Sequence, residues 1–184
     1  APGDGITLRN FPLVIKDTEN VIIRFIRSRL GDTSGVNGDS FEGNRVSNMI
    51  IDHCSFSWGT DETCSIYSVE NVSIQNCIIS EGLNRANHGY GSLLGGTNLS
   101  FYNNLMAHFT LRSPSIVSET GPTDLRNNVI YNWESRPTNN GSLSKANFFY
   151  NMYKPGPATN ARPSNELVNQ NVFWPTSRND DPNT

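Results

Sequence analysis

A nine-residue stretch, Asn48-Met-Ile-Ile-Asp-His-Cys-Ser-Phe56, sets the pattern of this 184-residue chain. Its order of polar and apolar positions returns most clearly in Asn71–Ile79 and Asn98–Met106. Weaker copies occupy four further segments, which are Asn20–Ser28, Pro122–Ile130, Lys145–Tyr153 and Asn165–Phe173. One position is apolar in every copy, and it holds Ile23, Ile51, Ile74, Phe101, Leu125, Phe148 and Val168. Self-similarity of this kind indicates a repeat architecture.

Consecutive copies lie 20 to 28 residues apart, which narrows the choice of architecture. Paired-helix repeats have longer periods, and the Leu-x-x-Leu-x-Leu pattern of leucine-rich repeats is absent from the sequence. Short strands of alternating polarity at this period favour coils that stack about 4.8 Å apart. The sequence therefore predicts an all-β fold, a parallel β-helix of about seven coils.

Asparagine is unusually frequent, with 25 residues in the chain. It is a poor helix former, because its side chain competes for backbone hydrogen bonds, and strands also tend to exclude it. The repeats give it a place, since three residues after the apolar column four copies carry Asn104, Asn128, Asn151 and Asn171. Stacked amides can hydrogen-bond along the axis of a sheet. We therefore predict an asparagine ladder at this turn, while a second set opens its repeats with Asn20, Asn48, Asn71 and Asn98.

The charge balance argues against some classes of partner. The chain has 14 Lys+Arg against 17 Asp+Glu, a formal net charge of −3. Nucleic-acid binders need a basic face, and membrane-surface proteins need clustered cations. No apolar run approaches the roughly 20 residues of a membrane-spanning helix. We expect a monomer that binds neither nucleic acid nor membranes, with one β-helix domain over residues 1–174 and a poorly ordered tail over residues 175–184.

Three cysteines leave an odd thiol. Cys54 and Cys77 occupy the column of the ladder, and we expect both to pack as buried small apolar side chains. A disulfide between Cys54 and Cys64, or between Cys64 and Cys77, stays open on the sequence alone. No spacing typical of a Cys/His zinc site occurs in the chain.

Chemistry on such a fold belongs in the loops, because the interior of a β-helix encloses no cavity. Four longer loops interrupt the repeats, and they carry Asp32, Asn37, Asp39 and Glu42; Asp61 and Glu62; Arg85, His88 and Tyr90; and Arg112 and Glu119. Loops of consecutive coils would stack side by side and bring acids of the first two next to cations of the others. Carboxylates clustered with backbone oxygens suit Ca²⁺. The alternative is that these residues are ordinary solvated loop acids.

The order and spacing of five motifs resemble those of pectate lyases of polysaccharide lyase family 1. The motifs are Asn37-Gly-Asp39, Ile50-Ile-Asp-His53, Leu93-Leu-Gly-Gly96, Asn103-Asn-Leu105 and Arg112-Ser-Pro114. The resemblance extends from about Ala1 to Phe173. It implies a right-handed parallel β-helix, secreted from the cell, that uses Ca²⁺ to cleave the acidic polysaccharide polygalacturonate (pectate) by β-elimination.

The same resemblance implies a set of calcium ligands. The family's acidic motif before the Asp-His box falls on Asn37-Gly-Asp39, where Asn37 departs from the family but keeps an amide oxygen. The next acidic pair falls on Asp61 and Ser65, and Ser65 departs as well. We expect the neighbouring Glu62 to supply the missing charge. The expected metal site is therefore Asn37, Asp39, Asp61 and Glu62.

The resemblance also implies a catalytic arginine. The arginine that takes the proton in the family matches Arg112, while the family's second arginine falls on Val117 and is missing. The family's substrate-binding lysine is replaced within the stretch that holds His88 and Tyr90. His88 is a rival base, since an arginine is normally protonated. We expect the substrate to be bound by Arg85, His88, Tyr90 and Lys154.

Two other functions stay open on the sequence alone. A polygalacturonase-type glycoside hydrolase would use a carboxylate pair such as Asp61 and Glu62 as acid and base. A non-catalytic carbohydrate-binding β-helix would account for the departures at Asn37, Ser65 and Val117. The motif around Arg112 favours the lyase, because a hydrolase leaves that motif unexplained.

Overall fold

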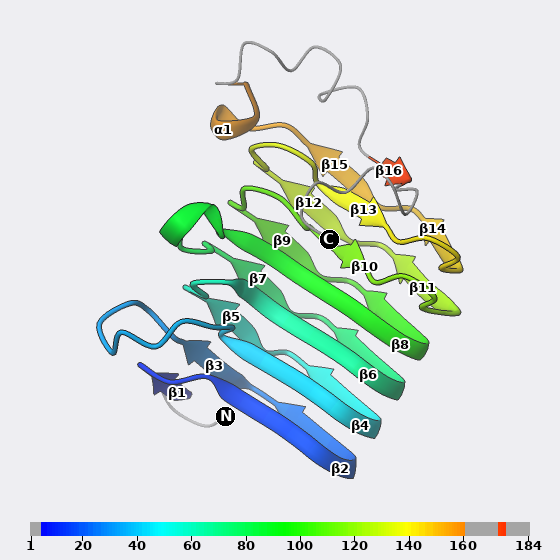
Figure 1. The fold of residues 1–184 in the computed structure, drawn as a ribbon, viewed down its shortest axis with the longest axis horizontal. Coiled ribbons are helices and arrows are strands. Elements are labelled where there is room, and N and C mark those ends of the chain that lie inside the picture. The colour runs from blue at the N-terminus through cyan, green and yellow to red at the C-terminus, as the bar shows by residue number, and fades with distance from the viewer. Residues whose placement is uncertain (1–4, 161–172, 176–184) are drawn as a thin grey trace.

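The structure, a computed structural model, describes residues 5–160 and 173–175. Within these residues the chain winds into a parallel β-solenoid of about six turns, which matches a right-handed parallel β-helix (Figure 1). The predicted all-β fold is therefore confirmed. Most of the seventh copy, including Val168 and Asn171, lies outside the described residues, and so does nearly all of the predicted tail.

Two sheets form the walls of the solenoid. The first, here called the short-strand sheet, contains in spatial order β1 (Ile6–Arg9), β3 (Ile26–Arg29), β5 (Ser55–Ser57), β7 (Ile78–Ser80), β9 (Leu105–Ala107), β12 (Val129–Tyr131) and β15 (Met152–Lys154). The second, the long-strand sheet, contains β2 (Leu13–Arg24), β4 (Phe41–Asp52), β6 (Glu62–Gln75), β8 (Tyr90–Tyr102), β10 (Ser115–Ile116), β13 (Thr138–Asn140) and β16 (Phe173–Pro175). Beside them, β11 (Thr123–Arg126) pairs with β8 and with β14 (Ala146–Phe149). A 3-10 helix, η1 (Arg85–Asn87), precedes β8, and a short helix, α1 (Pro157–Asn160), follows β15.

The apolar column of the repeats forms the core between the sheets. Ile23, Ile51 and Ile74 are partners in register on β2, β4 and β6. The column continues through Phe101, Leu125 and Phe148 on the following coils. Burial of each such side chain stabilises the fold by about 1.5–3 kcal/mol. Because every coil repeats this burial, the core alone accounts for much of the cohesion between coils.

The predicted asparagine ladder is present. Side-chain oxygens of Asn104, Asn128 and Asn151 accept hydrogen bonds at 2.9–3.0 Å from backbone N–H groups of the preceding coil, those of Cys77, Asn104 and Asn128. Their amide nitrogens also donate to the preceding coil, at 2.9–3.0 Å, and the acceptors are the backbone carbonyls of Ile74, Phe101 and Leu125. The asparagines therefore satisfy backbone groups that the turn would otherwise leave without partners.

A second ladder joins the asparagines that open the repeats. The amides of Asn20, Asn48, Asn71 and Asn98 are hydrogen-bonded in series at 3.0, 3.2 and 2.6 Å. All four residues have φ between 54° and 60°. Asparagine adopts this left-handed region more readily than most residues, so the backbone turn explains its presence here.

All three cysteines are free and buried. The backbone N–H of Cys54 donates to the sulfur of Cys77 in the next coil at 3.4 Å. The expectation that Cys54 and Cys77 pack as small buried side chains is confirmed, and neither of the two disulfides left open by the sequence is formed.

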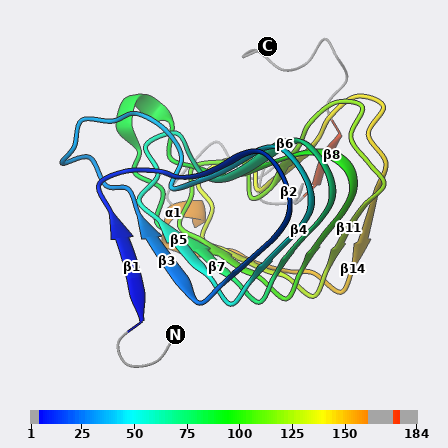
Figure 2. The same ribbon diagram turned by 90° about the horizontal axis from the view of Figure 1, so that it is seen from below.

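The loops that enter the long-strand sheet lie together along one side of the solenoid (Figure 2). Backbone hydrogen bonds of 2.8–2.9 Å connect each loop to the next, from Thr60 to Gly38, from Leu83 to Gly59 and from Thr110 to Gly89. The predicted side-by-side stacking of the loops is therefore confirmed. It brings together residues that lie far apart in the sequence.

Candidate active site

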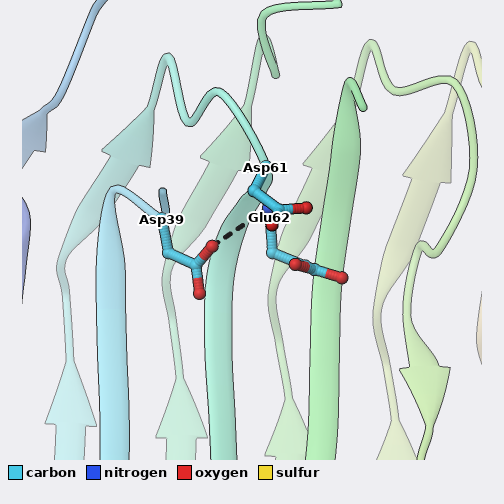
Figure 3. Close-up of side chains that lie close together, drawn as sticks. All are labelled: Asp39, Asp61 and Glu62. Atoms are coloured by element: carbon cyan, nitrogen blue, oxygen red, sulfur yellow. Dashed lines mark hydrogen bonds between the residues drawn. The ribbon is translucent and has the colours of Figure 1, made fainter. Parts of the chain in front are cut away.

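An acidic cluster lies where the first two loops enter the long-strand sheet. Asp39 precedes β4, whereas Asp61 and Glu62 lie at the start of β6 (Figure 3). One side-chain oxygen of each residue lies within 4.8 Å of those of the other two. Asp39 accepts a 3.1 Å hydrogen bond from the backbone N–H of Glu62 through Oδ1, and one from the Ser65 hydroxyl through Oδ2. Two successive coils thus present three carboxyl groups, here called the acidic cluster, to one point.

The acidic cluster carries charge at an energetic cost. Burial raises the pKa of Asp39 to about 7, and the neighbouring acids add to this shift while the hydrogen bond from Ser65 opposes it. Burial also raises the pKa of Glu62, where Arg112 opposes the shift. Both effects disfavour the charged carboxylates. A cation placed between them would remove this cost, so the electrostatics favour cation binding.

Arg112 reaches this cluster from two coils away. Its guanidinium forms an ion pair with the buried carboxylate of Glu62. The same guanidinium lies 4.3 Å from the ring centroid of Tyr90, whose ring is in turn 4.8 Å from that of His88. The carbonyl of Arg112 accepts a 2.6 Å hydrogen bond from the N–H of Ser92, which fixes its backbone to β8. The arginine is therefore held beside the acidic cluster at its backbone and at its side chain.

Comparison with known proteins gives this arrangement a context. No family model matches the sequence. The chain is 36% identical over 165 residues to a probable pectate lyase C of Aspergillus terreus, and 41% identical over 137 residues to that of Aspergillus flavus. These matches cover 86% and 72% of the chain. The chain is homologous to these proteins named probable pectate lyase C.

The homology extends over only part of those relatives. The chain spans 38% of the length of the Aspergillus terreus protein and 31% of the Aspergillus flavus protein. A third relative, the probable pectate lyase C of Aspergillus fumigatus, is 36% identical over 170 residues, and this match also covers 86% of the chain. The resemblance seen in the five motifs is therefore confirmed for this part of the protein.

The acidic cluster fits a calcium ion. Calcium binds oxygen ligands at about 2.3–2.6 Å, so two ligands of one ion lie at most about 5 Å apart. The 4.8 Å limit among the three carboxyl groups meets this condition. Three carboxyl groups leave room for further oxygen ligands, since calcium takes about six to eight.

The remaining predicted residues are placed less tightly around the cluster. Asn37 is exposed in the loop before Asp39, and its role as a ligand stays a prediction. Arg85 is exposed in η1. Lys154 is the last residue of β15, which lies four strands from β5 in the short-strand sheet. Because β5 belongs to the coil of Asp61, Lys154 lies about 19 Å from that coil along the solenoid axis. Its Nζ lies 5.9 Å from the ring centroid of Tyr131. The structure therefore unites Arg112, Tyr90 and His88 with the cluster, and places Lys154 apart from it.

The Asp-His motif lies at the other end of β4. Asp52 accepts hydrogen bonds from Arg24 at 2.8 Å, Asn76 at 2.9 Å and Gln75 at 3.2 Å. His53 lies 2.7 Å from the same carboxylate. The hydrogen bonds from Asn76, Gln75 and His53 lower the pKa of Asp52 to about 2, with the one from Asn76 contributing most. Asp52 therefore connects three coils, which is a structural role.

Sequence reasoning missed a polar network next to the cluster. The Tyr67 hydroxyl donates to Glu42 at 2.6 Å and accepts from the Asn44 amide at 2.8 Å. The register of β4 and β6 places Glu42 opposite Ser65 and Asn44 opposite Tyr67. That register, extrapolated from the repeats, was the signal that would have revealed the network.

No helix among the described residues is both long and apolar enough to cross a membrane.

Proposed function

We propose that this protein is a calcium-dependent pectate lyase that cleaves α-1,4-polygalacturonate by β-elimination. One observation carries the proposal, namely that Arg112 is paired with Glu62 inside an acidic cluster suited to calcium. The homology to proteins named probable pectate lyase C supports the same assignment.

The substrate and the site have complementary charges only if a cation is present. Polygalacturonate bears a carboxylate on each unit, and the acidic cluster would repel it. Asp39, Asp61 and Glu62, with Asn37 as a further oxygen donor, would hold calcium between the two. When bound, calcium would neutralise the uronate carboxylate and the negative charge that develops beside it during elimination.

Arg112 is the catalytic residue of this proposal. The proton at C5 is acidic because it is next to the carboxylate. Its removal leaves an electron pair that forms the C4–C5 double bond while the C4–O bond to the leaving sugar breaks. Arg112 accepts the proton at the imine nitrogen of its neutral guanidine form, which requires a neutral fraction and hence an alkaline optimum, while the oxygen of the leaving sugar takes up a proton from water. His88, whose ring lies beyond Tyr90, is the second candidate base.

The same loops supply the residues that would bind the polymer. Tyr90 packs against Arg112 and His88, and Arg85 precedes them in η1. Lys154 would contact only a substrate that extends along the axis by several units, given its separation from the cluster. Because the substrate is an extracellular polymer, we also propose that the protein is secreted; that it is a monomer stays a prediction from the sequence.

Digestion of polygalacturonate, followed by ultraviolet absorbance and by reducing-end release, tests this function. A lyase produces an unsaturated product that absorbs, and loses activity in EDTA. The variant Asp39→Ala should lose calcium-dependent activity, whereas Glu70→Ala, an exposed acid on the same strand as Glu62, should not. Reducing ends without absorbance would identify a hydrolase that uses Asp61 and Glu62, and neither product would identify a carbohydrate-binding protein.

A further inference from the structure

We propose that a second carbohydrate site, selective for an uncharged sugar residue, lies beside the acidic cluster. It is a cavity of about 500 Å³ on the outer face of the long-strand sheet. Tyr67 of β6 forms one wall, Val117 beyond β10 forms the other, and Gly95 of β8 lies between them. The inference rests on the proposed function only in taking a plant cell-wall polysaccharide as the source of the sugar.

The cavity adjoins the acidic cluster without including it. Leu93, which lines the cavity, is the partner in register of Ser65, whose hydroxyl donates to Asp39. Tyr67 follows Ser65 by two residues on β6, a distance of about 7 Å along the strand. A sugar in the cavity would therefore belong to the same polymer as a uronate at the acidic cluster, as a neighbouring residue or as a branch.

Tyr67 is fixed before any ligand arrives. Its hydroxyl is held by Glu42 at 2.6 Å and by Asn44 at 2.8 Å. An aromatic ring offers an apolar face for the C–H groups of a pyranose. Because the ring is already ordered, stacking costs little conformational entropy.

Glycine at position 95 keeps the cavity open. A Cβ atom there would lie 2.9 Å from Cγ2 of Val117 and 3.5 Å from Cβ of Tyr67. Any side chain at this position would therefore begin to fill the space between the two walls. The register of β6 against β8 shifts between Ile66 and Val69, so Tyr67 and Ser68 on β6 face the single residue Gly95 on β8.

The charge of the lining selects the ligand. Among the residues that line the cavity there is no lysine or arginine, and the one charged side chain is the exposed Glu119. A free uronate would meet a carboxylate of the same sign there. The exposed hydroxyls of Thr97 and Ser118 can hydrogen-bond to sugar hydroxyls. These features fit an uncharged pyranose.

Two sources could supply such a residue, a methyl-esterified galacturonate within the main chain or a neutral hexose in a branch. Isothermal titration calorimetry of the full chain in EDTA, where the proposed lyase is inactive, distinguishes them. The probes are fully methyl-esterified tetragalacturonate, β-1,4-galactotetraose and free-acid tetragalacturonate. We expect saturable binding of at least one uncharged probe and weaker binding of the free acid.

Substitutions at two lining residues test where the probe binds. Tyr67→Ala should lower the affinity for the uncharged probe by roughly tenfold, and Tyr67→Phe, which keeps the ring, should lower it less. Glu119→Lys, a change at an exposed position, should increase the affinity for the free acid relative to the uncharged probe, and it tests the site even if Tyr67→Ala does not fold.

The inference is overturned if neither uncharged probe binds the unmodified protein, or if Tyr67→Ala and Glu119→Lys both leave the affinities unchanged. Because calorimetry in EDTA needs no turnover, binding at Tyr67 without cleavage of polygalacturonate would support this site and refute the lyase. Cleavage of polygalacturonate without binding at Tyr67 would support the lyase and refute this site.

Discussion

The two ends of the long strands use polar residues in opposite ways. At the asparagine turn, which follows the strands, successive coils place the same residue at the same position, as in Asn104 and Asn128. At the acidic end, where the strands begin, successive coils place Asp39, Glu62, Tyr90 and Arg112. Identical residues satisfy identical backbone groups and stabilise the stack. Different residues brought together by the same stacking produce a site with several chemical functions.

Along each long strand, the residues that stabilise the fold lie at the asparagine turn, and the residues proposed for the chemistry lie at the acidic end. At the asparagine turn the side-chain amides donate hydrogen bonds of 2.9–3.0 Å to backbone carbonyls. The acidic end instead keeps carboxyl groups whose pKa values are raised by burial. Substitutions at the acidic end should therefore change activity more than stability, and those at the asparagine turn should do the reverse.

Replacing Arg112 should give the largest effect. Arg112→Ala removes the group assigned to proton transfer, and its rate of elimination should fall by roughly 10²- to 10⁴-fold. The measurement is the initial rate of ultraviolet absorbance on polygalacturonate at saturating calcium.

Arg126→Ala is the matched control for this change. Arg126 also lies over an aromatic ring, 5.0 Å from that of Tyr102, and also pairs with an acid, Asp124, but it lies on β11, well along the coil from the acidic end. It should retain its rate. Full activity in Arg112→Ala, or an equal loss in Arg126→Ala, would reject the assignment of Arg112.

Removing one rung of the asparagine ladder should give the next largest effect. Asn128→Ala leaves the carbonyl of Phe101 and the N–H of Asn104 without their partners. Each of the two unpaired buried groups costs about 1–3 kcal/mol, so we expect a loss of roughly 2–6 kcal/mol in the free energy of unfolding. Chemical denaturation measures it. If the folded variant lost calcium-dependent activity while its stability was unchanged, the separation of stability from chemistry would be wrong.

The same contrast explains what the sequence could reveal. The apolar column and the ladder were predictable, because a residue that repeats at a fixed offset needs no knowledge of loop shape. The three acids were predicted as one site from the family resemblance, which Asp39 and Asp61 match, with Glu62 expected to supply the charge missing at Ser65. Stacking of the loops predicted that acids would lie beside cations, but the specific pair of Glu62 and Arg112 was not predicted, since it joins residues 50 positions apart across an intervening coil. Lys154 was predicted to bind the substrate because of its charge. Counting the coils between it and Asp61 would have shown that it lies far from the acidic cluster.

The acidic end should also make stability depend on pH in the absence of calcium. The pKa of Asp39 is about 7 in the folded protein against 3.8 for an unperturbed aspartate. Between about pH 4 and pH 7 the folded state keeps a proton that the unfolded chain has released, so stability is lost as the pH rises through this window. Allowing for partial exposure of the carboxyl group, the loss should be roughly 1–3 kcal/mol.

Thermal unfolding at pH 5 and pH 8 in EDTA measures this dependence. Asp39→Asn, which cannot ionise, should show a smaller difference between the two pH values. Calcium should also reduce the difference, because it stabilises the charged cluster at pH 8. An unchanged pH difference in Asp39→Asn would show that other groups cause it.

The smallest effect should come from the second ladder, and it sharpens the comparison within the asparagines themselves. Asn71→Ala removes the 3.2 Å and 2.6 Å bonds to Asn48 and Asn98, but all three side chains are exposed, so water replaces the lost partners. The remaining cost is that alanine tolerates the φ of 55° less well than asparagine, about 1 kcal/mol. Asn71→Gly relieves this backbone strain without restoring the amide, so it should be more stable than Asn71→Ala in the same denaturation assay. If instead both variants lost as much stability as Asn128→Ala, the exposed amides would matter as much as the buried ones, and burial would not be what makes the ladder at Asn104 and Asn128 stabilising.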